Sequence, residues 1–167
     1  TGIFIGGKNA ILALDMLAAA RQAMFPPFQI SVFADPAGSF TTAAAMVAKV
    51  EKALGGGLRD RGVAVFGATG VVGFAAAVIA AAEGAKATLI GYDGAARVTT
   101  LAALAKERFK VDLGYADGSS DSLKEQAIKD VDVILAAGRA GVEIVSASLL
   151  AKAPNLKVAA DVNAVPP

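Results

Sequence analysis

The stretch GATGVVG, residues 67–73, places three glycines three residues apart, between the apolar run VAVF and a long segment of Ala, Val and Ile. Between a strand and a helix, such glycines permit a tight turn, let a diphosphate approach the main chain, and let the helix pack on the strand. The helix start then offers unpaired N–H groups and a partial positive charge. The loop predicts a dinucleotide site at Gly67, Ala68, Thr69, Gly70, Val71, Val72 and Gly73. A turn needed only for packing is the alternative.

An acidic residue stands where it could distinguish the two nicotinamide cofactors. Asp93 lies 20 residues after Gly73, at the end of the apolar run KATLIG, and Tyr92 directly before it is a further candidate for cofactor binding. A carboxylate there accepts hydrogen bonds from the adenosine ribose and repels a 2′-phosphate, which favours NAD. Arg97 could offset that repulsion by pairing with a phosphate, so NADP stays open. A simple turn at YDG is the alternative.

Two further groups at expected strand ends could line the same crevice. The run VDVILAAG ends in small residues that leave room for ribose and nicotinamide, and LKVAADVN ends in polar residues that could bind the carboxamide. These candidates are Ala136, Ala137, Gly138, Asp161 and Asn163. Packing, or an ordinary turn after a strand, explains them equally well.

A second polar group precedes the glycine loop, in GGK at residues 6–8 and DPAGSFTT at residues 35–42. Such groups, at a strand end and a helix start, could bind a polar heterocycle or a carboxylate. The candidates for substrate binding are Lys8, Asp35, Ser39, Thr41 and Thr42. On composition alone a structural interpretation is favoured, with Asp35 and Pro36 in a turn and Ser39 or Thr41 as a helix cap.

The composition restricts the chemistry. The 167 residues include no Cys and no His, which excludes thiolate zinc sites, Cys nucleophiles, His-dependent triads and His metal sites, and we expect no metal. The formal net charge of +1 gives no broad attraction for nucleic acid or anionic membranes. The longest apolar stretch meets Glu83 well before the roughly 20 residues that span a bilayer. Chemistry must therefore come from carboxylates, Lys, hydroxyls, backbone amides or a cofactor.

Short apolar runs alternate with longer helical segments, which predicts an α/β fold with a doubly wound parallel Rossmann sheet. Strands are expected at 2–5, 29–34, 63–66, 86–91, 110–116, 131–138 and 156–163, and helices at 8–25, 43–54, 71–82, 95–109, 120–128 and 143–153. The run GGG predicts a boundary between part of a smaller α/β substrate domain, residues 1–57, and a dinucleotide-binding domain, residues 58–167. Without an initiator Met or signal peptide, and with an abrupt stop at AVPP, the sequence reads as the interior of a longer protein.

The motifs TGIFIGGKNA, VFADPAGSFTTAAAMVA, VAVFGATGVVG, GYDG, VDVILAAG and DVNAVPP, in this order and spacing, resemble the NAD(P)-dependent methylenetetrahydromethanopterin dehydrogenases of methylotrophic bacteria. The resemblance covers essentially the whole chain. It implies hydride transfer from methylenetetrahydromethanopterin to NAD or NADP, giving the methenyl form in the route from formaldehyde to formate. It also implies that the polar residues of segment 1–57 face the pterin. The product cation is delocalised over two nitrogens, so no strong general base is needed and no catalytic residue is assigned.

Two other functions stay open at this point. One is a methylenetetrahydrofolate dehydrogenase, whose usual Lys-bearing motif is not recognisable here. The other is a non-enzymatic NAD(H)-sensing Rossmann domain, which would need no second pocket facing the nicotinamide. We expect a cytoplasmic homo-oligomer that acts on a small-molecule pterin, tetrahydromethanopterin being the one-carbon carrier, with no nucleic-acid or membrane partner.

Overall fold

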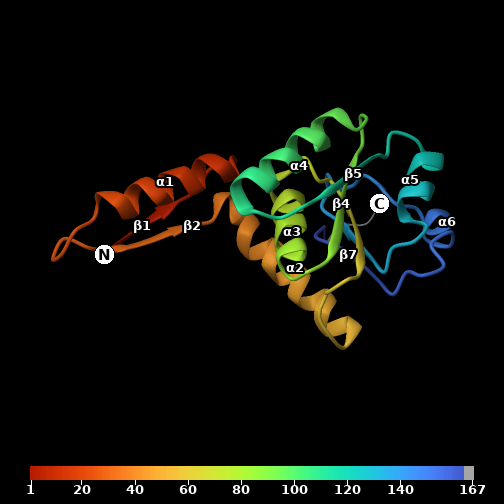
Figure 1. Cartoon of the computed structure of the whole chain (residues 1–167), viewed down its shortest axis with the longest axis horizontal. Helices are drawn as coiled ribbons and strands as arrows, with labels where there is room; N and C mark the ends of the chain where they lie inside the picture. Colours follow the sequence, from red (N-terminus) through yellow and green to blue (C-terminus); the bar gives the residue numbers. More distant parts are fainter. Residues whose placement is uncertain (164–167) are drawn as a thin grey trace.

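The computed structural model describes residues 1–163, which form two parallel sheets (Figure 1). In the small sheet, β1 (Gly2–Ile5) pairs with β2 (Ser31–Ala34), and α1 (Ala10–Ala23) connects them. The large sheet has the order β5-β4-β3-β6-β7. Its strands are β3 (Gly62–Phe66), β4 (Lys86–Gly91), β5 (Gly114–Asp117), β6 (Val133–Ala136) and β7 (Val158–Asp161). The predicted doubly wound parallel sheet is confirmed.

Helices cover both faces of the large sheet. They are α2 (Ser39–Leu54), α3 (Val71–Ala82), α4 (Ala96–Phe109), α5 (Asp121–Ile128) and α6 (Ala147–Leu150). Alternate residues of a strand point to opposite faces, so Val63 and Val65 of β3 pack in the cluster that includes α2, α3 and α4. Ala64 and Phe66 pack on the other side, with residues of α5 and α6. Burial on both faces explains why these strands read as continuous apolar runs.

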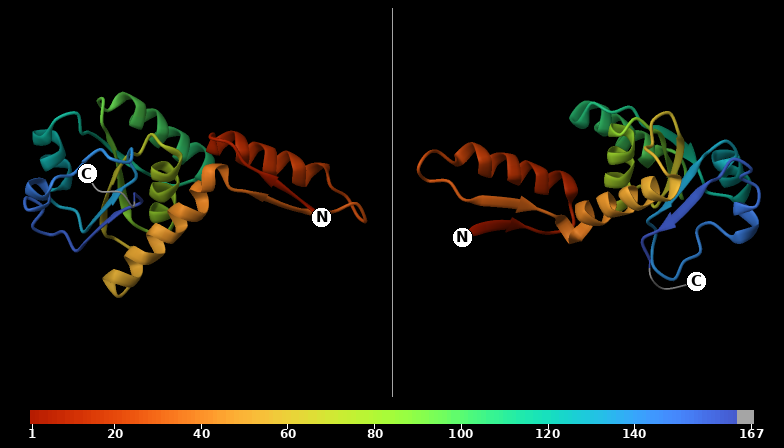
Figure 2. Two further views of the ribbon diagram at one scale, coloured as in Figure 1. Left: turned by 180° about the vertical axis from the view of Figure 1, so that it is seen from behind. Right: turned by 90° about the horizontal axis from the view of Figure 1, so that it is seen from below.

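Helix α2 links the small sheet to the core of the large one. It follows β2 after a short 3-10 turn (Pro36–Gly38), and it packs against α3 and β7. Figure 2 shows it running from the end of the small sheet along the larger unit. Met46, Val47 and Val50 are buried in the same cluster as β3. The division at residue 57 stays a prediction, but this packing joins most of α2 to the second core.

The small sheet is covered on one face. Helix α1 packs over Ile5 and Ala34 through the buried Ala13. On the opposite face Phe4 and Phe33 face each other across the strands, with ring centroids 5.9 Å apart, and are 65% and 54% exposed. The strand predicted at residues 2–5 is therefore present but mostly exposed, because no described element covers this second face.

Other differences from the predicted elements have local causes. Helix α2 begins at Ser39 rather than at residue 43, because DPAGSFTT is not an open loop but the capped start of the helix. Strand β5 begins at Gly114 rather than at residue 110, because Lys110 ends α4 in a left-handed conformation. Helix α6 is shorter than the predicted segment 143–153.

Two features of residues 1–163 bear on the function classes. None of the helices described combines the length and apolar character needed to cross a membrane. Over the same residues, no three Asp or Glu side chains gather closely enough to hold a metal ion.

Candidate functional site

A cleft of about 590 Å³ opens at the carboxyl edge of the large sheet, where the loops after β3, β4, β5 and β6 meet. The strand order reverses between β3 and β6, and in doubly wound sheets ligands bind at this switch point. Of the residues predicted to bind a cofactor, the cleft brings together Gly67, Thr69, Gly70, Tyr92, Ala137 and Gly138. The glycine loop therefore adjoins a cleft at the edge of the sheet where ligands bind in this fold.

The three glycines of the loop have different surroundings. Gly67 has a φ of +68°, and a Cβ there would lie 2.3 Å from the carbonyl oxygen of Ala137. A Cβ at Gly73 would lie 2.4 Å from the carbonyl oxygen of Gly67. Gly70 has an ordinary φ of −83°, and its Cβ would meet only that same oxygen, at 3.3 Å. Close packing thus accounts for Gly67 and Gly73, whereas Gly70 presents bare main chain to the cleft.

Helix α3 begins beside the cleft. The Gly70 N–H donates to the carbonyl of Gly67 at 2.9 Å, and the Gly70 carbonyl accepts from Phe74 at 3.0 Å. No side chain of residues 1–163 caps this helix start. The N–H groups of Val71, Val72 and Gly73, in the first turn, lack partners within the helix by its geometry, and they carry a partial positive charge. An anion at Gly70 would meet these groups.

An exposed cluster at the rim of the cleft consists of the predicted cofactor-binding residues Tyr92, Asp93 and Arg97. Arg97 donates from Nη1 to the Tyr92 hydroxyl at 3.1 Å and to Oδ2 of Asp93 at 3.2 Å. Its guanidinium lies 5.7 Å from the centre of the Tyr92 ring. The hydrogen bond to Asp93, followed by that to Tyr92, raises the pKa of Arg97 above its usual value. Tyr92 lines the cleft, whereas Asp93 and Arg97 lie just outside the lining.

The other predicted cofactor residues lie near the cleft but do not line it. Ala68 and Ala136 are buried in the core. Asn163 donates from Nδ2 to the carbonyl of Gly138 at 3.2 Å and to Oδ1 of Asp161 at 2.9 Å. The ends of β6 and β7 are joined in this way, next to the cleft.

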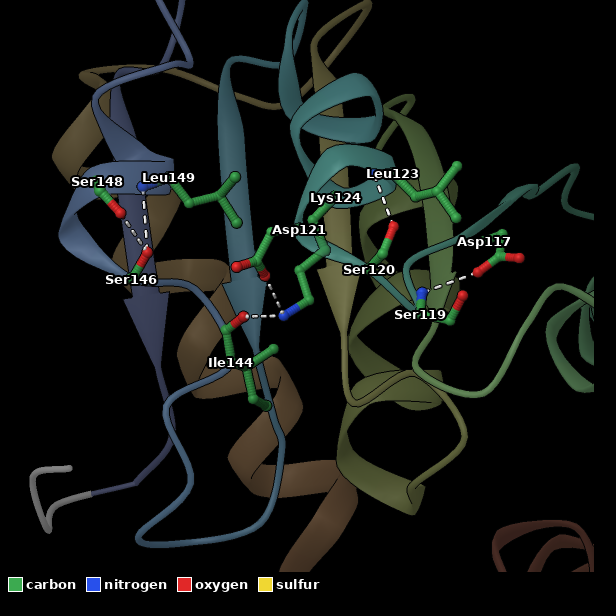
Figure 3. A network of polar contacts seen from close by, with 10 residues as sticks. All are labelled: Asp117, Ser119, Ser120, Asp121, Leu123, Lys124, Ile144, Ser146, Ser148 and Leu149. Carbon is green, nitrogen blue, oxygen red and sulfur yellow. Dashed lines mark hydrogen bonds and ion pairs between the residues drawn. The ribbon is translucent and has the colours of Figure 1, made fainter.

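One wall of the cleft was missed from the sequence. It consists of the turn after β5, one lysine of α5 and the loop after β6, with Gly118, Ser119, Lys124, Arg139, Val142, Glu143 and Ile144. Lys124 donates from Nζ to the carbonyl of Ile144 at 3.0 Å, which joins α5 to the loop after β6 (Figure 3). It also pairs with Asp121 of its own helix at 3.2 Å. The sequence did carry one signal for this wall, a glycine, Gly118, directly after a strand. The structure explains this glycine, because a Cβ at Gly118 would lie 2.4 Å from Cγ2 of Ile90.

Backbone and hydroxyl contacts shape the turn between β5 and α5 (Figure 3). Ser119 donates its N–H to Oδ1 of Asp117 at 2.8 Å, and hydrogen bonding by Ser119 lowers the pKa of that carboxyl. Ser120 caps α5 by accepting from the N–H of Leu123 at 3.3 Å. These contacts order the turn that presents Gly118 and Ser119 to the cleft.

The substrate-side candidates lie near the carboxyl edge of the small sheet. Asp35 is 6% exposed and accepts from the N–H of Phe40 at 2.8 Å and from the Thr41 hydroxyl at 2.6 Å. The buried Ser39 hydroxyl donates to the carbonyl of Pro36 at 2.6 Å. Both residues therefore organise the start of α2, in line with the structural interpretation, although Asp35 itself is the cap. Lys8 and Thr42 are exposed.

We expect Asp35→Ala to lower the free energy of unfolding by about 1–2 kcal/mol at pH 7, because α2 loses its cap. The hydrogen bond from the Thr41 side chain lowers the pKa of Asp35 against the opposing effect of burial, and the N–H groups of Phe40 and Thr41 lower it further. The carboxylate's contribution to the free energy of unfolding is therefore complete above the ordinary Asp pKa of about 3.9. It is lost as the pH falls through the lower pKa that Asp35 has in the folded protein. Urea unfolding of the wild type and of Asp35→Ala, at pH 7 and at acid pH, measures the difference in their free energies of unfolding. A difference that does not become smaller in acid would contradict the prediction.

Comparison with known proteins gives relatives over the whole chain. Residues 1–37 match the family model described as "Methylene-tetrahydromethanopterin dehydrogenase, N-terminal". The chain is 55% identical to the NAD(P)-dependent methylenetetrahydromethanopterin dehydrogenase of Methylorubrum extorquens and 34% identical to the bifunctional protein MdtA of the same bacterium. Both alignments cover 100% of this chain and 58% of the relative, so the chain spans little more than half of the length of these relatives.

A solved structure supports the fold. A dipicolinate synthase polypeptide from Bacillus halodurans is similar over 93% of this chain and 48% of its own length, with a TM-score of 0.57 at 20% identity. At that identity the likeness concerns the fold alone. Over its whole length the chain is therefore similar to a little more than half of a methylenetetrahydromethanopterin dehydrogenase, and its first 37 residues match the N-terminal model of that family.

Proposed function

We propose that the protein is an oxidoreductase that transfers a hydride from methylenetetrahydromethanopterin to NAD or NADP, leaving the methenyl form. The observation that carries this proposal is the cleft at the sheet's switch point, where Gly70 presents main chain beside the uncapped start of α3. The relative at 55% identity supports the choice of substrate and cofactor through its name. Because the relatives are longer, residues outside these 167 could also contribute to the activity.

The residues of the cleft fit a dinucleotide. A Cβ at Gly70 would fill the place where a diphosphate can reach the N–H groups of Val71 and Val72. Asp93 would accept hydrogen bonds from the ribose hydroxyls, and the small residues Ala137 and Gly138 would leave room for the rest of the cofactor. The nicotinamide supplies the carbon that accepts the hydride. The chain's own task is then to orient the two reactants and exclude water, which requires no titrating base.

We extend the proposal to the division of labour along the chain. Residues 1–57 would contribute to the pterin side and residues 58–167 would bind the dinucleotide. Lys8 and Thr42 are the candidates for direct contact with the pterin, because Asp35, Ser39 and Thr41 already hold the start of α2 through their hydrogen bonds. A cytoplasmic homo-oligomer without a nucleic-acid partner belongs to the same proposal.

Asp93→Ala should weaken the binding of NAD about tenfold and leave that of NADP unchanged or stronger. The variant removes the acceptor for the ribose hydroxyls, and it also removes the charge that repels a 2′-phosphate. Dissociation constants for both cofactors, measured by isothermal titration calorimetry, test this prediction. Equal losses for NAD and NADP would show that Asp93 does not contact the ribose.

Steady-state turnover of the full chain tests the proposed function. Methylenetetrahydromethanopterin and methylenetetrahydrofolate are each offered with NAD and with NADP, and reduction of the cofactor is followed by absorbance. The proposal requires turnover of the methanopterin compound. Turnover of the folate alone would make the protein a folate enzyme, and NAD(H) binding without turnover of either compound would favour a sensing domain.

A further inference from the structure

The turn between β4 and α4 holds a cation between two partners on its own segment. Arg97 contacts Asp93 at 3.2 Å and the Tyr92 hydroxyl at 3.1 Å, and it lies over the Tyr92 ring. The turn is tightly folded, because a Cβ at Gly91 would lie 2.0 Å from the carbonyl oxygen of Gly94, and Gly94 has a φ of +108°. The backbone of the turn therefore fixes the positions of the Cα atoms of Asp93 and Arg97, while their side chains extend into solvent.

The contact between Arg97 and Asp93 is easily broken. The two side chains are 54% and 39% exposed and stand four residues apart. Exposed pairs of this spacing change an equilibrium by only about twofold. A charge-assisted hydrogen bond to a phosphate is stronger, changing affinity by about tenfold or more. A phosphate placed within reach would thus compete successfully with Asp93 for the guanidinium.

The other charged groups of the cleft belong to different walls. Lys124 is held by the carbonyl of Ile144 and by Asp121, on the side of α5. Arg139 and Glu143 lie in the loop after β6. In a doubly wound sheet the adenosine ribose lies at the end of the second strand, which here is β4. Arg97 is therefore the cation of the described cleft region that stands on the ribose segment itself.

We propose that Arg97 allows one site to accept both cofactors by exchanging partners. With NAD it stays on Asp93 and Tyr92, so that the free oxygen of Asp93 receives the ribose hydroxyls. With NADP it turns from Asp93 to the 2′-phosphate and offsets the repulsion between the two anions, while the Tyr92 ring remains beneath it. This inference rests on the proposed function, since it presumes that the cleft binds a nicotinamide dinucleotide.

Dissociation constants of the full chain for NAD and NADP, measured by isothermal titration calorimetry, test the exchange. Arg97→Met keeps the length of the side chain and removes its charge, and it should weaken NADP about tenfold or more while changing NAD by less than about threefold. Arg97→Lys keeps the charge but lacks the planar guanidinium, which can bind a phosphate through two hydrogen bonds, and it should recover part of the NADP affinity. Lys106→Met is the matched control, because Lys106 lies on the same helix as Arg97 and forms an exposed pair with Asp112, at 2.7 Å. It should change neither constant.

The outcomes separate this inference from the proposed function. Equal losses of both cofactors with Arg97→Met, or no loss of either, would overturn the role of Arg97 while the wild-type protein still binds NAD and NADP. A wild-type protein that binds neither cofactor would refute the proposed function and the inference with it. Unchanged thermal melting of the variants shows that a selective loss does not come from unfolding.

Discussion

Gly70→Val should abolish the binding of NAD and NADP and leave the protein folded. Gly70 has a φ of −83°, which valine adopts readily, and its Cβ would meet one carbonyl oxygen at 3.3 Å. The side chain would project into the cleft, where the proposed diphosphate approaches the first N–H groups of α3. Loss of two charge-assisted hydrogen bonds alone corresponds to a weakening of about 100-fold or more.

Calorimetric titration with each cofactor measures this loss, and circular dichroism checks the fold. Gly56→Val is the matched control, because a Cβ at Gly56 meets nothing within 4 Å and this residue lies outside the cleft lining. The control should bind both cofactors like the wild type. Cofactor binding retained by Gly70→Val would refute the assignment of the loop as the diphosphate site.

Gly67→Ala should have the largest effect on stability, lowering the free energy of unfolding by about 2–5 kcal/mol. Its left-handed backbone costs a residue with a Cβ about 1–2 kcal/mol. The new methyl group would also lie 2.3 Å from the backbone carbonyl oxygen of Ala137, and overpacking of this kind typically costs about 1–3 kcal/mol more. Backbone cannot rotate away as a side chain can, so the loops must shift.

Urea unfolding separates the two contributions with a control of the same backbone conformation. Gly55 also has a φ of +68°, but a Cβ there meets nothing within 4 Å. Gly55→Ala should therefore show the conformational cost alone, about 1–2 kcal/mol. Equal losses in the two variants would mean that the clash with Ala137 contributes nothing to the loss of stability in Gly67→Ala.

Local sequence patterns predicted those elements whose ends are marked within the chain itself. The predicted bounds of α3 and β4 match the structure, because the glycine loop marks the start of α3, and charged residues and glycines set off the ends of the apolar run of β4. The early start of α2 was not predicted, because its cap, Asp35, lies beyond a 3-10 turn rather than next to the helix.

The candidate site was predictable where one segment carries it, and not where separate segments meet. The spacing of the glycines identified the loop, and the structure distinguishes Gly70 from its two packed neighbours. The wall that contains Lys124 and Ile144 arises only when the chain after β5 approaches the loop after β6. No periodicity or motif within either segment encodes that approach.

The loops after β3 and β6 pack against each other through their backbones, and a hydrogen bond connects the loop after β6 to α5. Gly67 lies against the carbonyl of Ala137, and Lys124 holds the carbonyl of Ile144. An engineer who transplants the glycine loop from another dehydrogenase would therefore have to bring the segment 137–144 along with it. Recombination between relatives should succeed only at crossover points that inherit both pieces from one parent.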